Sequence, residues 1–516
     1  MSSFAHQITT NGSTNGSTNG THNDSQRAEP SGISVLIIGA GVGGLVAALE
    51  CYRKGHDVRV LERSDSASAG GKSVLPSTAT GDMFTIGLSG RRFVRHYPAM
   101  AKELDEISVH NGWTRFRKHT GDDIGAPFPS NMPPGTTVAV PADEQPMVMQ
   151  LRPLFHRMLY NQIQRFGIDV SYGRRIVEYY EDADRGVAGI VTDKGEREEA
   201  DLVIAADGLS SHSRDVVLGG QGKGKPSGRS IVRAAIPLET AMADPLVAEY
   251  FGLKDGKDPV MQPWMGPETH AMVLSYADKQ GENKQLLWGL TYTELSTAAQ
   301  STTESWQNSV SNEDVLRLME KVLGWGEPMK ALVRTMPEGS IIFWPLLWRN
   351  PNPLVHSKGG RVLQIGDAAH TFLPTSGNGA TQAIEDAVTI AACLQHAGKA
   401  DIPAAVRTHA LLRGDRVATA QFLGFYNAER FQKADMKAIG KDAKKVDVKV
   451  PKWIYTSDPE KYADANFAKA KASLEGGELF KNTNIPEGYE PEPWTMEGIE
   501  RLYAEGKQVE LKGDWS

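Results

Sequence analysis

A glycine-rich turn near the N-terminus limits the folds open to this chain more than any other feature. An apolar strand over residues 35–38 is followed by Gly39, Gly41 and Gly44 and then by a helix. In such a unit the first glycine allows a tight turn, the second lets a pyrophosphate approach the main chain, and the third lets helix and strand pack closely. The next strand, DVRVLE, ends at Glu62, whose carboxylate can accept hydrogen bonds from a ribose diol. The sequence therefore predicts a dinucleotide-binding unit on a parallel sheet, and the glutamate favours FAD or NAD over NADP.

The composition narrows the class of protein further. The 516 residues are 40% hydrophobic and 23% charged, with a net charge of −7, which is typical of a globular protein and argues against nucleic acid as a partner. No apolar run is long enough to predict an integral membrane span. Cys51 and Cys393 each follow an apolar helical run and are expected to be buried thiols in a reducing compartment, so we expect a cytoplasmic protein. Residues 1–32, rich in Asn, Gly, Ser and Thr, are expected to form a disordered tail.

Two later motifs repeat the pattern of a strand that ends in a turn. The run ADLVIAADGLSSHSRD contains a strand that ends at Asp207-Gly208. The run RVLQIGDAAH contains another buried strand, which ends at Gly366-Asp367. Ligands of α/β sheets bind at the carboxyl ends of the strands, where Asp367 is expected. A loop over residues 374–379 then leads into a helix whose first N–H groups are available to an electron-rich oxygen.

These three motifs, in this order, resemble the class A FAD-dependent monooxygenases. These are the p-hydroxybenzoate and salicylate hydroxylase-like enzymes, a group that includes many fungal enzymes of secondary metabolism. The resemblance covers about residues 33–430. It implies bound FAD, with NADPH or NADH as a transient co-substrate because the glycine-rich fingerprint occurs once. It also implies that a C4a-hydroperoxyflavin, formed with dioxygen, hydroxylates or epoxidises an aromatic, indole-like or polyketide-like substrate.

The resemblance also implies which residues bind the cofactor. Glu62 corresponds to the residue that holds the ADP ribose, and Arg152 to an arginine at the start of a helix that contacts FAD. Asp207-Gly208 corresponds to a segment associated with both FAD and the nicotinamide. A flat flavin ring needs bare main chain beside it, which explains the glycines before the helix at residue 380. The predicted cofactor-binding residues are Gly39, Gly41, Gly44, Glu62, Gly71, Arg152, Asp207, Gly208, Asp367, Gly377, Gly379, Ala380 and Thr381.

The residues between the second and third motifs predict a separate substrate layer. The runs RSIVRAAIPLE, HAMVLSYAD, KQLLWGLTYTE and SIIFWPLLWRN are typical of strands, which we expect to form a mixed sheet over the flavin. Arg233 matches an arginine that binds a phenolate or other substrate oxygen in some members of the family. His270 and Tyr276 are further candidate catalytic residues on these strands. No grouping of His, Cys and carboxylates predicts a metal site.

The predicted fold class is α/β (α+β overall), with a Rossmann-like FAD-binding domain, a mixed-sheet substrate domain and a helical C-terminal region. The expected boundaries are 1–32 for the tail, 33–225 and 351–430 for the two parts of the FAD-binding domain, 226–350 for the substrate domain, and 431–516 for the C-terminal region. Three alternatives stay open at this point. They are a flavin-dependent dehydrogenase or reductase, a flavin halogenase, and a non-catalytic escort protein with a dinucleotide fold. The sequence does not predict an oligomeric state.

Overall fold

The structure is a computed structural model. It describes residues 27–65, 83–109, 112–130, 140, 144–220, 224–293, 308–321, 324–432, 439–440, 448–507 and 509–516. Most of the predicted tail, and Gly71, lie outside these ranges. At the end of that tail, Arg27 donates to the carbonyl oxygen of His56 and pairs with Asp57, at 3.0 Å in both cases. Ordered contacts therefore begin before Ile33, where the sequence had suggested their start.

A five-stranded parallel sheet forms the nucleotide-binding half. Its strands, in spatial order, are β18 (Val362–Gln364), β12 (Leu202–Ala205), β1 (Ser34–Ile38), β2 (Asp57–Leu61) and β8 (Asp169–Ser171). Both faces of β1 are covered. Val35 and Ile37 pack against helices α1 (Val42–Arg53), α5 (Arg152–Phe166) and α11 (Gly379–Ala397), whereas Leu36 and Ile38 pack on the opposite side. A strand buried on both faces needs the continuous apolar run that the sequence shows.

A three-stranded antiparallel sheet covers that opposite face. It consists of β9 (Ile176–Asp182), β10 (Val187–Thr192) and β11 (Arg197–Ala200). Ala188 and Ile190 of β10 share a core cluster with Leu36 and Ile38 of β1. This sheet was not predicted from the sequence.

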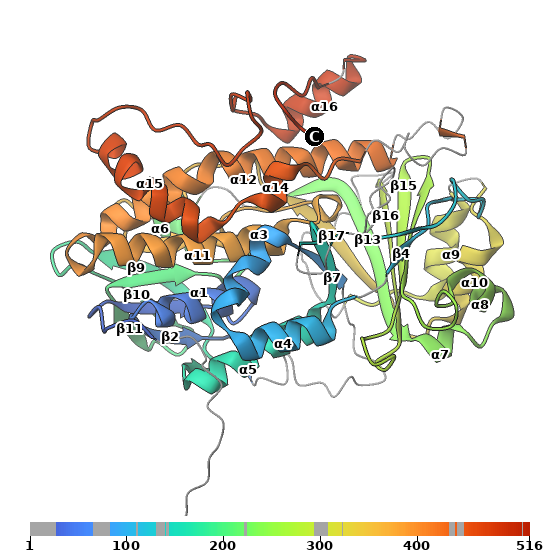
Figure 1. Ribbon diagram of the computed structural model, residues 1–516, viewed down its shortest axis with the longest axis horizontal. Coiled ribbons are helices and arrows are strands. Elements are labelled where there is room, and N and C mark those ends of the chain that lie inside the picture. Colours follow the sequence, from blue (N-terminus) through green and yellow to red (C-terminus); the bar gives the residue numbers. More distant parts are fainter. Residues whose placement is uncertain are drawn as a thin grey trace, which may run out of the picture.

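An eight-stranded mixed sheet forms the other half of the molecule (Figure 1). Its main path is β17 (Ile342–Trp348), β13 (Lys225–Pro237), β16 (Gln285–Thr293), β15 (Thr269–Tyr276), β14 (Val260–Gly266), β4 (Trp113–Thr114) and β6 (Phe128–Pro129), and β5 (Arg117–Lys118) pairs with β14. The four strands predicted for the substrate layer are β13, β15, β16 and β17. The short strands β4, β5 and β6 also belong to this sheet, although the expected boundaries assigned them to the FAD-binding domain.

Side-chain alternation along β13 sets apart the two faces of this sheet. Val232 and Ala234 pack against an outer layer of helices, so Arg233 projects from the opposite face. The outer helices are α7 (Leu238–Ala241), α8 (Pro245–Phe251), α9 (Asn312–Glu320) and α10 (Glu327–Thr335). On β15 the same alternation sends Ala271 and Val273 outward. Tyr276, on the inner face, packs with residues of α5 and of β7 (Met147–Leu151).

The remaining elements follow in chain order. They are β3 (Met83–Gly87), α3 (Leu88–Arg91), the 3₁₀ turn η1 (Arg92–His96), α4 (Pro98–Ile107), α6 (Arg214–Leu218), the 3₁₀ turns η3 (Gly366–Ala368), η4 (Pro374–Ser376) and η5 (Lys399–Asp401), α12 (Ile402–Gln432), α14 (Lys452–Thr456), α15 (Pro459–Leu474) and α16 (Met496–Ala504). Helix α12 contacts α11 in one half and β15 in the other, and Figure 1 shows it running above both.

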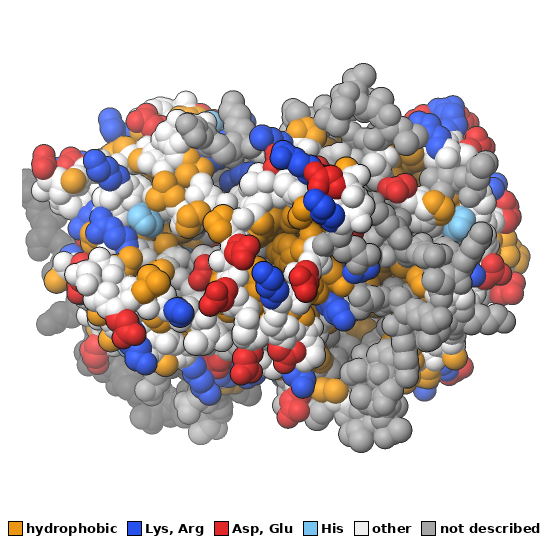
Figure 2. Space-filling model, turned by 90° about the horizontal axis from the view of Figure 1, so that it is seen from above, with side chains coloured by type: hydrophobic (Ala, Val, Ile, Leu, Met, Phe, Trp, Pro, Cys, Tyr) orange, Lys and Arg blue, Asp and Glu red, His pale blue; other side chains and the backbone are white. Residues whose placement is uncertain are grey.

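Within the described ranges, no helix combines the length and apolar character that a bilayer span requires. Seen from above, the surface intersperses basic with acidic side chains (Figure 2).

Candidate functional site

The first glycine-rich turn has two glycines packed inside and one facing out. Gly39 has a φ of +104°, and a Cβ there would lie 2.5 Å from the carbonyl oxygen of Ala206. A Cβ on Gly44 would lie 1.9 Å from the carbonyl oxygen of Gly39. At Gly41, by contrast, a Cβ would meet nothing within 4 Å. The turn therefore needs Gly39 and Gly44 for its own packing, and Gly41 leaves open main chain at the start of α1, where a phosphate can approach.

Glu62 lies at the end of β2, directly beside that turn. One carboxylate oxygen accepts the N–H of Ala40 at 2.8 Å, and the other accepts the N–H and hydroxyl of Ser64 at 2.9 and 2.7 Å. Burial raises the pKa of Glu62, but these hydrogen bonds outweigh burial and hold the pKa below its ordinary value. His156 of α5 bonds the carbonyl oxygen of Ala40 at 2.7 Å, so the turn is supported from two sides.

The Asp207-Gly208 turn follows β12, next to β1. Gly208 has a φ of +82°, and a Cβ there would meet open space. The hydroxyl of Tyr179 donates to Asp207 at 2.6 Å. Burial raises the pKa of Asp207, although hydrogen bonds from Ser211 and Tyr179 oppose the increase. The predicted residue Arg152 is exposed at the first position of α5.

The turn after β18 carries Asp367; this turn and the Asp207-Gly208 turn are called the two acidic turns below. Gly366 has a φ of +57°, and its successor Asp367 has an exposed side chain. This turn and the loop after it lie at the carboxyl end of the parallel sheet, which is the expected position for a ligand. Gly379, the first residue of α11, and Ala380 are both half-buried, so main chain near the helix start reaches the surface.

Two residues that were predicted to line the flavin, Gly377 and Thr381, instead face the protein. A Cβ on Gly377 would lie 2.7 Å from the hydroxyl of Thr85 and 2.9 Å from the terminal methyl of Met147. Thr381 has no exposed surface, and its hydroxyl accepts the N–H of Gly87 at 2.9 Å. Gly377 therefore lets the loop pack on β3 and β7, and the side chain of Thr381 fixes the first turn of α11.

Sequence reasoning missed Arg349, which connects the two acidic turns. It is the residue after β17, and its guanidinium is buried. It donates to the carbonyl oxygens of Asp367 at 2.6 Å, Ala368 at 2.8 Å and Leu209 at 3.2 Å. An arginine directly after an apolar strand was the available signal, but its acceptors lie far away along the chain.

The three predicted catalytic side chains lie on the inner face of the mixed sheet in different surroundings. Arg233 is half-buried, and its guanidinium lies 4.6 Å from the centre of the Trp344 ring. His270 is buried and stacks on Phe431 of α12 at 5.3 Å between ring centres. Burial, with a smaller effect from a nearby arginine, lowers the pKa of His270 to about 4, so its ring is neutral near pH 7.

Tyr276, the third candidate, has a structural role. Its hydroxyl donates to the carbonyl oxygen of Ile107, the last residue of α4, at 3.1 Å. Burial is the main reason that the pKa of Tyr276 is raised. Of the three predicted residues, Arg233 is therefore the one that carries a charge and is only half-buried. Half-buried Met272 lies in register with Arg233, one strand beyond Gly289, and adds soft apolar surface on this side.

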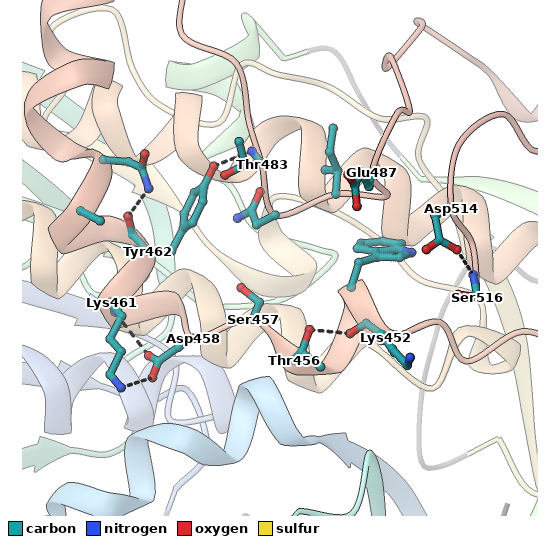
Figure 3. Close-up of a pocket in the computed structure, with 15 residues that line it drawn as sticks. Lys452, Thr456, Ser457, Asp458, Lys461, Tyr462, Thr483, Glu487, Asp514 and Ser516 are labelled. Carbon is teal, nitrogen blue, oxygen red and sulfur yellow. Dashed lines mark hydrogen bonds and ion pairs between the residues drawn. The ribbon is translucent and has the colours of Figure 1, made fainter.

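A separate hollow of about 510 Å³ lies in the C-terminal region. Residues of α14 and α15 and of the last segment border it, including Lys452, Asp458, Tyr462 and Asp514 (Figure 3). Among the described residues that line it, none belongs to the predicted cofactor or substrate set. The candidate site is therefore the group of turns at the carboxyl end of the parallel sheet, together with the inner face of the mixed sheet.

These features fit FAD. Gly41 offers open main chain for a pyrophosphate, Glu62 presents a charged carboxylate beside it, and Asp367 is exposed near the start of α11. In the described part of the chain, no group of His, Cys, Asp and Glu is arranged to hold a metal ion.

Comparison with known proteins agrees with this assignment. The family model described as "FAD binding domain" matches residues 32–335 and 349–403. The FAD-dependent monooxygenase dmxR9 of Cryptosporiopsis sp. (strain 8999) is 40% identical over 495 residues, which is 95% of this chain and 91% of that protein. The crystal structure of FqzB superposes with a TM-score of 0.75 at 27% identity, over 89% of this chain and 99% of that one. The structure of CtdE in complex with FAD and substrate 4 gives a TM-score of 0.73 at 26% identity, over 86% of this chain and 100% of that one.

The relatives also decide between the alternatives left open by the sequence. Several curated relatives matched over 95% of this chain are named FAD-dependent monooxygenases, which supports that enzyme class over a dehydrogenase, a halogenase or a non-catalytic escort protein. The predicted resemblance and the predicted cofactor FAD are thereby confirmed. With its glycine-rich turn, its two acidic turns and its mixed sheet, this chain belongs to the family of FAD-dependent monooxygenases.

Proposed function

We propose that this monooxygenase takes electrons from NADH or NADPH and uses dioxygen to hydroxylate or epoxidise an electron-rich aromatic compound, such as a phenol, an indole or a polyketide-like ring system. When bound, FAD supplies the electron transfer and the activation of dioxygen. The observation that carries the proposal is the shared support of both acidic turns by Arg349, at the edge of the parallel sheet that faces the mixed sheet. This arrangement supports a cofactor lying across the turns, with the substrate between it and the mixed sheet.

The turns bind and orient the cofactor in this proposal. Gly39, Gly41, Gly44 and Glu62 hold the ADP portion, and the Asp207-Gly208 segment serves the cofactor and the nicotinamide. Asp367 holds the ribityl or pyrophosphate region, and Gly379 and Ala380 lie against the flavin ring. The N-terminus of α11 stabilises negative charge by about 0.3–1 kcal/mol at an exposed site and by up to ~2 kcal/mol at a partly buried one. We also assign cofactor binding to Gly71, Arg152, Gly377 and Thr381. Gly377 and Thr381 contribute to it through the main chain.

Arg233 orients the substrate in this proposal. An arginine stays protonated at all relevant pH values and can hold a phenolate or a carbonyl oxygen. Its guanidinium lies over the ring of Trp344, and the nearby apolar surface of Met272 suits a planar substrate. The buried, neutral His270 and the hydrogen-bonded Tyr276 shape the wall of the site. We further propose a cytoplasmic location, which suits the two buried thiols Cys51 and Cys393.

Anaerobic reduction followed by isotope labelling tests this function. We expect NADH or NADPH to bleach the flavin of the purified holoprotein faster when an aromatic substrate is present, and the product to carry one oxygen from labelled dioxygen. Arg233→Ala should keep its FAD and raise the substrate KM by about tenfold, because a hydrogen bond to a charged group contributes roughly that much. The control is Arg317→Ala, an exposed arginine of α9 that pairs with Asp314.

Each result bears on one part of the proposal. A product without labelled oxygen would contradict the monooxygenase reaction on the tested substrates. Loss of flavin from the Arg233 variant would contradict the assignment of Arg233 to the substrate side. Equal KM values for the Arg233 and Arg317 variants would remove Arg233 from substrate binding.

A further inference from the structure

A buried carboxylate holds the turn that carries Asp367. Asp386 lies two turns into α11 and is 2% exposed. Its Oδ2 atom accepts the main-chain N–H of Gly366 at 3.0 Å and bonds Nε2 of His370 at 2.6 Å. Gly366 and His370 bracket the Asp367 turn, and the N–H of His370 also donates to the carbonyl oxygen of Gly366 at 2.9 Å. One oxygen of Asp386 therefore fixes both ends of the turn.

The position of Asp386 is set in turn by α12. Nε of Arg413 donates to Oδ1 of Asp386 at 2.8 Å, and another nitrogen of the same guanidinium donates to the side-chain oxygen of Gln382 at 2.6 Å. Burial opposes the charge on Asp386, but His370 and Arg413 overcome it and lower the pKa of this carboxyl far below its ordinary value. Asp386 is thus a charged acceptor held between α12 and the turn.

The neighbouring residue Glu385 has a different set of partners. It is also buried, and its carboxylate forms ion pairs with the guanidinium groups of Arg413 and Arg416. The Oε1 atom of Glu385 also bonds the amide of Gln382 within α11. No hydrogen bond described for Glu385 reaches residues 366–370. The two adjacent carboxylates share Arg413, yet Asp386 alone of the pair contacts the turn.

We propose that Asp386, held by Arg413, is a positioning residue that orients the Asp367 turn for binding FAD. It does not touch the cofactor. It acts by fixing both ends of the turn together, through the ring of His370 and the main chain of Gly366. The φ of Gly366 is +57°, a conformation that few other residues adopt. The inference rests on the proposed contact between Asp367 and FAD.

Matched isosteric variants test this role. Asp386→Asn keeps the size of the side chain but replaces an acceptor by an NH₂ group that faces donors, whereas Glu385→Gln makes the same change one residue earlier. The measurement is the dissociation constant of FAD from apoprotein, followed by quenching of flavin fluorescence, together with the visible spectrum of the bound flavin. We expect Asp386→Asn to raise the dissociation constant by about tenfold and to shift the spectrum, since it removes hydrogen bonds to a charged group. Glu385→Gln should lower thermal stability similarly but change the constant by less than about threefold.

Equal changes in FAD affinity for the two variants would overturn the proposal, because a general loss of packing would then explain both. If Asp386→Asn does not fold, His370→Phe carries the same test, since it keeps an aromatic ring but removes the donor to Asp386. An unchanged dissociation constant for His370→Phe would then overturn the proposal. Asp367→Asn separates this inference from the proposed site, because unchanged FAD affinity in that variant would contradict the contact of Asp367 with FAD itself.

Discussion

The Glu62 carboxylate accepts three hydrogen bonds from within the protein, from Ala40 and Ser64. They fix its orientation and keep it charged, because its pKa is held below the ordinary value. A carboxylate accepts more than one bond at each oxygen, so Glu62 retains capacity for a ribose diol. The same side chain thus stabilises the glycine-rich turn and prepares it for binding.

Replacing Glu62 by Gln should weaken both effects. The amide presents NH₂ to one set of donors, so we expect a loss of about 1–3 kcal/mol in the free energy of unfolding and weaker FAD binding. Because the folded pKa is depressed, the stabilisation is present above the ordinary pKa of 4.5 and is lost as the pH falls through the folded value. Urea unfolding of both apoproteins from neutral pH to below about pH 4 should therefore show the difference narrowing with acid. A difference that stays constant with pH would contradict the charged role of Glu62.

The residues that sequence analysis identified and those that it missed differ in how far along the chain their contact partners lie. Glu62 bonds Ala40 and Ser64 within the first strand–turn–helix–strand unit. Gly44 packs on Gly39 in the same unit, so the spacing of these residues was informative. The acceptors of Arg349 include Leu209, 140 positions away, and the contact of Asp386 with Gly366 spans 20 positions across a loop. Such contacts depend on tertiary structure, and neither the spacing nor the residue type indicates them.

At the level of elements, one carboxylate in the first turn of α15 meets four basic side chains of α1 and η1. Glu460 accepts from Arg53 at 2.6 Å and Lys54 at 2.8 Å, near the end of α1, and from Arg95 and His96 of η1 at 2.7 Å each. Burial raises the pKa of Glu460, but bonds from His96, Lys54 and Arg53 lower it far below its ordinary value. The helix lies beyond residue 403, where the match to the family model ends, yet it is tied to the first helix of the fold.

We expect Glu460→Gln to reduce the free energy of unfolding by about 1–3 kcal/mol, less than for a fully buried pair because Arg95 and His96 are partly solvated. The control is Glu475→Gln at the other end of α15, where the side chain is 64% exposed and pairs with Lys471 at 3.6 Å. The contribution of Glu460 is fully present above about pH 4.5 and declines as the pH falls toward the depressed folded value. Thermal melts at neutral and acidic pH measure both effects. Equal melting temperatures for the two variants at neutral pH would contradict the docking role of Glu460.

The elements themselves were predicted with uneven success. Apolar runs and partial alternation predicted β13, β15, β16 and β17, because each is long and has one face against the outer helices. The short strands β4, β5 and β6 have two residues each, too few for a periodic pattern, and they join the sheet only through contacts with β14 or with one another. The sheet of β9 to β11 was missed although its strands are longer, because no motif singled out that stretch.

For the molecule as a whole, two features couple the parallel sheet to the mixed sheet. Helix α12 packs on α11 and reaches the inner face of the mixed sheet, where Phe431 stacks on His270 and Glu429 pairs with Arg229. Arg349 leaves the end of β17 and binds carbonyl oxygens of both acidic turns. Substrate and cofactor are proposed to bind to different halves, so this coupling sets the distance between them.

Arg349→Lys should weaken that coupling without removing the charge. An ammonium group lacks the planar fork that reaches several carbonyl oxygens at once, so buried acceptors lose partners at a cost of about 1–3 kcal/mol. Since a ligand that binds more weakly stabilises the folded state less, we expect the rise in melting temperature caused by FAD to be smaller in this variant than in the wild-type protein. The control is Arg185→Lys, an arginine that is 56% exposed and bonds Asp182 and Glu199, where the same change should leave both melting temperatures nearly unaltered. An undiminished effect of FAD in Arg349→Lys would mean that the two turns keep their relative positions without this guanidinium, and α12 would then be the principal link between the two halves.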